Sequence, residues 1–230
     1  MRRDRQFLIF DADDTLWENN IYFEAAFEQF CDYLAHSSMS PPEIRAVLDE
    51  IELTNTKLHG YGSRNFAHNL AECYRRLAER HISERDLATV MDFAHAILER
   101  PMELIDGVAE TVADLAGRHS LTLFTKGDPE EQRLKIDRSG LARYFQHCAI
   151  VREKSEAAYR ALAVERDFRL ETTWMIGNSP KSDILPALSA GLGAVFVPHE
   201  RTWSLEKTEL PDNHPRLTTV ETIRDLHGLF

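Results

Sequence analysis

The stretch Phe-Leu-Ile-Phe-Asp-Ala-Asp-Asp-Thr at residues 7–15 decides the fold of this chain of 230 residues. Its four apolar residues are typical of a short strand that is buried on both faces of a parallel sheet. The carboxylates then follow at the carboxyl end of the strand, where ligands bind in open α/β sheets. Such carboxylates suit a hard cation, which prefers oxygen ligands. The alternative is an acidic turn, because Asp is a common turn residue.

The same junction recurs along the chain, which weakens the alternative of a simple turn. Apolar runs at 121–124, 149–151 and 173–176 each end in polar residues, and a helical pattern follows each of them. A fifth apolar run lies at 194–197. Alternating strands and helices predict a parallel sheet whose carboxyl ends share one rim. That rim would gather carboxylates, lysines and small polar residues, which suit a divalent cation and a phosphate.

Four ordered motifs resemble those of the haloacid dehalogenase superfamily, and in particular of its phosphatases. The first is the stretch 7–15, with its Asp-x-Asp-x-Thr pattern. Thr125 at the end of a strand resembles the second motif, and Lys154 before a helix resembles the third. The fourth, at 177–183, begins Gly-Asn where the family often has Gly-Asp. The resemblance implies an α/β fold, with a Rossmann-like parallel sheet core and an inserted α-helical cap of the C1 type.

The resemblance also implies a chemistry, which is magnesium-dependent hydrolysis of a phosphomonoester. Asp11 would attack phosphorus, and Asp13 would protonate the leaving oxygen and then deprotonate water. Thr15 would orient these two carboxylates. The phosphate-binding residues that the resemblance implies are Thr125, Lys126, Gly127 and Lys154. The implied Mg²⁺ ligands are Asp11, the backbone carbonyl of Asp13, Asp183, and Asn178 through water.

Two of these positions leave an alternative open. Asn178 lacks the charge of the commoner Asp, so Asp183 alone would carry that side of the metal site if Asn178 makes no contact. The Lys126 side chain would be merely solvated if its backbone does the binding. Asp14 occupies a variable place in the family pattern, and no chemistry is expected of it.

Far more residues separate the first two strand patterns than a βαβ crossover needs, which predicts an insertion. Apolar residues at helical spacing, such as Phe23, Phe27 and Phe30, indicate that the insertion is a bundle of four amphipathic helices. The expected domains are an α/β core at 1–16 and 101–230 and an α-helical cap at 17–100.

A glycine-flanked loop at 58–66 joins two of the expected cap helices. Its aromatic ring and hydrogen-bond donors make Tyr61, Arg64 and Asn65 candidates for substrate specificity. In the resembled capped enzymes, a loop at about this place faces the catalytic rim. The alternative is an ordinary turn between helices with a stacked tyrosine.

The remainder of the core has weaker signals. A helix is expected at 181–190, with Pro186 causing a kink or a displaced start. From 198 to 215 the pattern is lost, which predicts a long loop, and Val220, Ile223 and Leu226 predict a closing helix.

Composition limits the partners and the compartment. The chain has 27 Lys and Arg against 38 Asp and Glu, a net charge of −11, which argues against a general nucleic-acid binder. No apolar run is long enough to cross a bilayer, and the basic start at 2–5 lacks the apolar region of a signal peptide. The three cysteines fit no zinc spacing. We therefore expect a cytoplasmic enzyme with a small phosphorylated substrate and no nucleic-acid or membrane partner, in an oligomeric state that is open.

Three other functions stay open. A phosphomutase or phosphotransferase would use the same rim. A haloacid dehalogenase shares the nucleophilic Asp but lacks the second Asp of the first motif, so Asp13 favours phosphoryl chemistry. A non-catalytic binding module would have no use for the intact set of acidic residues. A dinucleotide-binding domain is disfavoured, because no Gly-x-Gly-x-x-Gly follows the first strand.

Overall fold

The computed structural model describes residues 5–230. Residues 1–4, which include most of the basic start, lie outside the described part. The chain divides into two compact units. The first, which we call the sheet unit, combines the segment up to Glu18 with Met102–Phe230, and the second, the helical unit, is Asn19–Pro101. The boundaries expected from the sequence lie within two residues of these.

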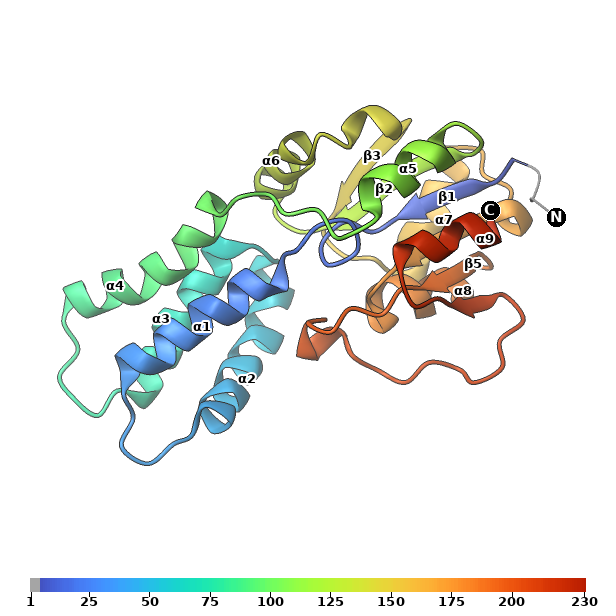
Figure 1. Cartoon of the computed structure of the whole chain (residues 1–230). Helices are drawn as coiled ribbons and strands as arrows, with labels where there is room; N and C mark the ends of the chain where they lie inside the picture. The colour runs from blue at the N-terminus through green and yellow to red at the C-terminus, as the bar shows by residue number, and fades with distance from the viewer. Residues whose placement is uncertain (1–4) are drawn as a thin grey trace. The chain divides into compact units, whose positions relative to one another are not determined.

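The sheet unit is built on a parallel sheet (Figure 1). Its strand order is β3-β2-β1-β4-β5-β6. Its strands are β1 (Phe7–Phe10), β2 (Ser120–Lys126), β3 (His147–Val151), β4 (Thr173–Gly177), β5 (Gly193–Phe196) and β6 (Leu217–Thr219). All neighbouring pairs are parallel, which confirms the predicted Rossmann-like fold. The strand order reverses between β1 and β4, and such a reversal is where ligands bind in open α/β sheets.

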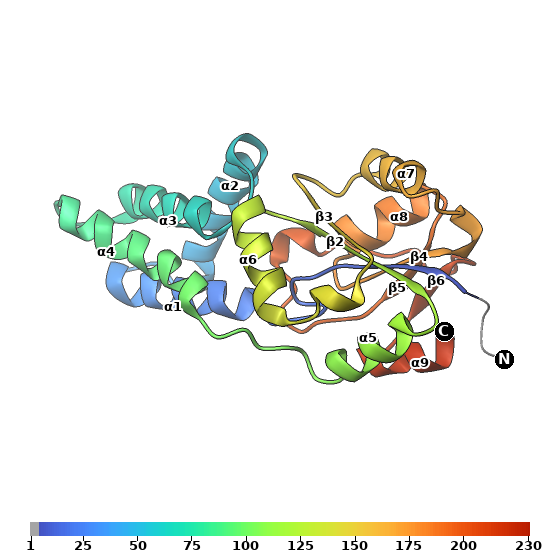
Figure 2. The same cartoon turned by 90° about the horizontal axis from the view of Figure 1, so that it is seen from above.

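Helices cover both faces of this sheet (Figure 2). They are α5 (Val108–Ala116), α6 (Pro129–Ser139), α7 (Glu156–Glu165), α8 (Leu185–Ser189) and α9 (Leu226–Leu229). Leu8 and Phe10 of β1 belong to the core that includes residues of α5 and α9, whereas Ile9 belongs to the core on the α7 and α8 side. All three are fully buried. Burial of side chains of this size stabilises by roughly 1.5–3 kcal/mol each.

Local signals account for most helix ends. The Asp128 side chain caps α6 by accepting hydrogen bonds from two backbone amides at 3.0 Å, and Gly140 ends this helix with a φ of 68°. The helix expected at 181–190 begins instead as a single π-helical turn, Pro180–Ile184, which precedes α8. Pro186 has no N–H to donate, so it fits only in the first turn of a helix, and α8 starts one residue before it.

The C-terminal segment differs most from expectation. The predicted long loop contains a 3₁₀ turn, Ser204–Glu206, and β6 follows it. The closing helix shrinks to a 3₁₀ turn, Ile223–Asp225, followed by α9, so the prediction of helix from Val220 is wrong. β6 forms because it pairs with β5 along one edge, and three residues are too few to show strand periodicity in a sequence.

The helical unit contains α1 (Asn20–Leu34), α2 (Pro41–His59), α3 (Ser63–Leu77) and α4 (Glu84–His95). Its core includes Phe30, Leu48, Leu70, Tyr74 and Val90, all completely buried. Capping boxes start α2 at Ser40 and α4 at Ser83. Among residues 5–230, no helix of either unit is long and apolar enough to cross a membrane.

Candidate active site

The carboxyl end of β1 delivers Asp11 into the sheet unit. The backbone amide of Asp11 donates to the carbonyl of Ile176 at 2.9 Å, which ties the first motif to β4. The Thr15 hydroxyl lies 3.0 Å from Asp11 Oδ2 and 3.1 Å from Asn178 Oδ1, so its single proton serves one of these acceptors at a time. Asp14 takes the left-handed conformation, with a φ of 59°, in the turn between Asp13 and Trp17.

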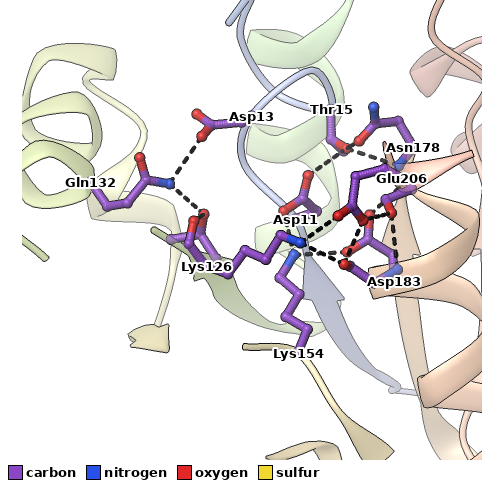
Figure 3. Close-up of polar contacts among 12 residues, drawn as sticks. Asp11, Asp13, Thr15, Lys126, Gln132, Lys154, Asn178, Asp183 and Glu206 are labelled. Carbon is purple, nitrogen blue, oxygen red and sulfur yellow. Dashed lines mark hydrogen bonds and ion pairs between the residues drawn. The ribbon is translucent and has the colours of Figure 1, made fainter. Parts of the chain in front are cut away.

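A buried ammonium joins two buried carboxylates at the centre of the site (Figure 3). Lys154 Nζ donates to Asp183 Oδ1 at 2.8 Å and also to Asp11 Oδ1. The Lys154 and Asp183 side chains are each 1% exposed. Lys154 precedes α7, whose cap is Ser155, so a rigid helix start holds the lysine in place. The structure therefore unites the first, third and fourth motifs around one cation.

Two carboxylates share this single ammonium, and the pKa of Asp183 reflects the imbalance. Burial and the neighbouring Asp11 carboxylate raise the pKa of Asp183 to about 7, although Lys154 opposes the change. Burial alone lowers the pKa of Lys154, but Asp11 and Asp183 outweigh it and raise that pKa above its ordinary value. The lysine is thus held charged. Because two carboxyl groups face this one cation, a second cation at the site would be favoured electrostatically.

Gly177 allows the fourth motif to fold closely around Asp183. A Cβ atom at residue 177 would lie 2.3 Å from Asp183 Oδ2, so a side chain there would displace the carboxylate. The amide of Ser179 donates to the same oxygen at 2.9 Å, and the Asp183 amide donates back to the Ser179 carbonyl. The motif thus orients Asp183 through backbone groups and through the absence of one side chain.

Three donors hold the Asp13 carboxylate on the α6 side of the site (Figure 3 shows Asp13 with Gln132). Trp17 Nε1 donates to Oδ1 at 2.8 Å and Gln132 Nε2 donates to Oδ2 at 3.1 Å. Lys135 Nζ lies 3.0 and 2.9 Å from the two oxygens. The Asp13 side chain remains 23% exposed, so it keeps access to water.

Gln132 also connects Asp13 with the second motif. Its Nε2 donates to Thr125 Oγ1 at 2.6 Å. A Cβ at residue 127 would lie 2.9 Å from the Gln132 side chain, so Gly127 makes room for this link. The Gly127 amide, which was expected to donate to phosphate, donates in this structure to the carbonyl of Val151 at 3.2 Å.

Lys126 is not merely solvated. Its Nζ lies 2.6 Å from Glu206 Oε1 and 2.8 Å from Ser182 Oγ, and its side chain is 14% exposed. Asn178 points its amide oxygen at Thr15 and donates from Nδ2 to Thr202 Oγ1 at 3.0 Å. Both side chains are thus engaged by protein partners.

The specificity candidates lie in the helical unit, at the turn between α2 and α3. Gly60 and Gly62 have φ values of 85° and 113°, which glycine adopts without a steric cost. Asn65 Nδ2 donates to the carbonyls of His59 and Tyr61 at 2.8 and 3.3 Å. Asn65 therefore closes the turn, while Arg64 is exposed and Tyr61 half-buried.

Gln132, Lys135 and Glu206 are among the site residues to which the sequence assigned no role. Gln132 and Lys135 are spaced by three on a helix whose polar residues resemble an ordinary solvated face. Their spacing, a few residues after the Asp128 cap, is the one sequence signal that could have pointed to Gln132 and Lys135. Glu206 lies in a segment without periodicity and carried no signal.

A second polar group lies on the other side of the first motif. Ligand atoms of Asp14, Glu18 and His199 lie within 4.8 Å of one another. His199 Nε2 is 3.3 Å from Glu18 Oε2, so two members of the group contact each other directly. His199 therefore lies beside carboxylates in the fold, although its spacing from other residues in the sequence does not resemble that of a metal site.

Comparisons with known proteins agree with this arrangement. The family model of haloacid dehalogenase-like hydrolases matches residues 7–191. No curated protein matches the chain. A haloacid dehalogenase-like family hydrolase from Xanthomonas campestris is 31% identical, with a TM-score of 0.83, over 99% of this chain and 95% of its own.

More distant structures share the fold and differ in their described activity. L-2-haloacid dehalogenase from Xanthobacter autotrophicus is 15% identical, with a TM-score of 0.67, and 98% of each chain is covered. A predicted phosphoglycolate phosphatase from Haemophilus somnus is 16% identical, with a TM-score of 0.65, over 98% of this chain and 97% of its own. These two similarities show the fold alone. The family match over most of the chain, together with the relative from Xanthomonas, shows that this protein is an enzyme of the haloacid dehalogenase-like hydrolase family.

Proposed function

We propose that this enzyme is a magnesium-dependent phosphomonoester hydrolase that acts on a small phosphorylated metabolite through an aspartyl-phosphate at Asp11. The observation that carries the proposal is the pair of carboxylates after β1. Asp11 lies against the buried Lys154, whereas Asp13 lies two residues on, held by its own donors and reachable by water. One carboxylate is thus placed as a nucleophile beside a cation, and the other as an acid and base.

The donor set fits magnesium. Asp11 and Asp183 face one ammonium, so two buried carboxyl groups share a single positive partner, and Mg²⁺ prefers carboxylate oxygens. Asp11, the backbone carbonyl of Asp13 and Asp183 would hold the ion. When bound, it would offset the repulsion between the Asp11 carboxylate and a phosphate dianion. The Asn178 oxygen points at Thr15, which supports the view that Asp183 carries that side alone.

The chain's own residues account for the proton and bond changes. An Asp11 oxygen forms a bond to phosphorus while the bond to the alcohol oxygen breaks, and Asp13 gives that oxygen its proton. Asp13, now ionised and stabilised by Lys135 and Gln132, then takes a proton from water. The resulting hydroxide attacks phosphorus and releases phosphate and the Asp11 carboxylate. Lys154 and the Thr125 hydroxyl stabilise charge on the phosphoryl oxygens.

Asp13 is what favours phosphatase over dehalogenase activity. A halide leaving group needs no proton, so a dehalogenase has no use for an acid two residues after its nucleophile. The three donors around Asp13 support a functional carboxylate, because a mere turn residue has no need of a lysine, a glutamine and a tryptophan.

A substrate panel tests the proposal. The purified enzyme is incubated with phosphorylated metabolites, with p-nitrophenyl phosphate and with 2-chloropropionate, each with Mg²⁺ or with chelator. We expect phosphate release that requires Mg²⁺ and no halide release. Transfer to an acceptor sugar would indicate a mutase, and halide release without phosphate release would refute the proposal. Asp11→Asn, which cannot form the acyl-phosphate, is the matched inactive control.

We also propose that the helical unit is a cap and that Tyr61 and Arg64 take part in substrate selection. Support comes from the exposure of Arg64, the partial exposure of Tyr61, and a turn built on two glycines with positive φ. Asn65 contributes by holding this turn in shape.

A further inference from the structure

Glu206 is a buried acid that reaches the site from a segment without a predicted role. It ends the 3₁₀ turn Ser204–Glu206 and is 7% exposed. Its Oε1 lies 2.6 Å from Lys126 Nζ, and its Oε2 accepts from the hydroxyls of Ser179 and Ser182 at 2.5 Å each (Figure 3). One carboxylate therefore joins the second motif, the fourth motif and the segment that follows β5.

Ser179 connects Glu206 with Asp183, the proposed metal ligand. The Ser179 hydroxyl donates to Glu206, and its backbone amide donates to Asp183 Oδ2 at 2.9 Å. The Ser182 amide donates to the Ser179 hydroxyl at 3.0 Å, which fixes the same turn from the other side. Because Asp183 is oriented by the Ser179 amide, a group that fixes Ser179 also fixes Asp183.

The same carboxylate forms an ion pair with Lys126. Lys126 follows Thr125, and its ammonium contacts both Glu206 and Ser182. Burial raises the pKa of Glu206, but Lys126 and the hydroxyls of Ser179 and Ser182 together outweigh burial and lower this pKa. With Lys126 held by Glu206, Lys154 is left to serve the carboxylates of Asp11 and Asp183.

The segment that carries Glu206 also meets the residue at which this chain departs from its family's motif. Asn178 stands where the family often has Asp, and its Nδ2 donates to Thr202 of the same segment. Lys181 Nζ, one turn further on, donates to the carbonyl of Leu205 at 2.9 Å. The segment therefore contacts the fourth motif at three positions, Thr202, Leu205 and Glu206.

We propose that Glu206 is a positioning residue of the active site, which fixes Asp183 through Ser179 and holds Lys126 through an ion pair. The inference rests on the proposed function for the identity of the metal. Groups that orient a metal ligand from outside typically contribute 10–100-fold to metal affinity or activity. Replacing Glu206 should therefore weaken Mg²⁺ binding even where no substrate is present.

The test measures Mg²⁺ binding by calorimetry in a set of variants. Glu206→Met should bind Mg²⁺ roughly 10–100-fold more weakly than the wild type. Glu206→Gln should lose less, because its amide oxygen can still accept from Ser179. Glu209→Gln, an exposed acid on the same segment, is the matched control and should bind normally.

A double variant keeps the test informative if Glu206→Met fails to fold. That single change removes the 2.6 Å partner of the Lys126 ammonium and leaves it with Glu153 at 3.6 Å and the Ser182 hydroxyl. Lys126→Met/Glu206→Met instead replaces both partners of the close pair with apolar groups of similar shape and should fold. We expect the double variant to bind Mg²⁺ more weakly than Lys126→Met alone. Equal binding by these two proteins, or wild-type binding by Glu206→Met, would overturn the link through Ser179. If the Glu206 variants bind Mg²⁺ more weakly but the wild-type enzyme releases no phosphate from any substrate, the proposed function would be refuted. The positioning role of Glu206 would still be supported.

Discussion

Gly177 illustrates at the scale of one residue how the site depends on a missing side chain. A Cβ there would lie 2.3 Å from Asp183 Oδ2 and 2.8 Å from Asp183 Cβ, so the Asp183 side chain would have to shift. We expect Gly177→Ala to lower the free energy of unfolding by roughly 1–3 kcal/mol and to weaken Mg²⁺ binding. Denaturant unfolding and a Mg²⁺ titration check this. Gly228→Ala, whose Cβ would meet nothing within 4 Å, is the control, and equal behaviour of the two variants would contradict the account.

Asp183 should make the metal-free protein sensitive to pH. Its pKa is raised to about 7 in the folded protein, against about 3.9 for an unperturbed Asp, so the folded state binds the extra proton. This stability is present below about pH 4 and is lost as the pH rises towards 7 and above.

Asp183→Asn should remove that loss, because an amide cannot ionise. Without metal, we expect the variant to match the wild type at low pH and to unfold at a temperature a few degrees higher at pH 8. With Mg²⁺ the wild type should gain stability and the variant should not. A variant less stable at every pH would show that the Lys154 ion pair outweighs the repulsion between the carboxylates.

At the scale of elements, α6 contributes more than cover for the sheet. Gln132 and Lys135 reach Asp13 from one helical face. We expect Lys135→Met to lower kcat/KM about tenfold or more, part of the 10²–10⁴-fold that general acid–base catalysis supplies. The loss should be larger for an alkyl phosphate than for p-nitrophenyl phosphate, whose leaving group needs less help. Arg133→Met, an exposed change on the same helix, is the control. Equal losses on both substrates would separate Lys135 from proton transfer.

Elements with strong local signals were predictable from sequence, and elements formed by tertiary pairing were not. The four apolar runs beyond β1 coincide with β2–β5, and the side chains of Asp128 and Ser83 cap the helices that follow them. β6 was missed because its pairing with β5 alone makes it a strand.

The candidate site shows the same division. The ammonium of Lys154 contacts both Asp11 and Asp183. This meeting could be predicted, because all three residues follow the carboxyl ends of strands. Glu206 was not predicted, because the sequence of an aperiodic segment does not distinguish a buried acid from an exposed one. Gln132 was hidden for a similar reason, since its burial depends on Gly127 leaving room for it.

At the scale of the whole molecule, the helical unit is expected to set substrate preference. Tyr61→Ala and Arg64→Ala should change relative kcat/KM among metabolite phosphates. They should affect p-nitrophenyl phosphate much less, because a small aryl ester leaves contacts with a cap unused. Arg75→Ala, an exposed change on α3, is the control. An unchanged ranking of substrates would return the turn between α2 and α3 to a purely structural role.

The covalent intermediate tests the central claim most directly. The enzyme is mixed with substrate and Mg²⁺, quenched in acid during turnover, and its peptides are examined by mass spectrometry. We predict one phosphoryl group on Asp11, removed by hydroxylamine as expected of an acyl-phosphate, and none in folded Asp11→Asn. Phosphate release by Asp11→Asn, or a phosphoryl group on any other residue during turnover, would contradict the account.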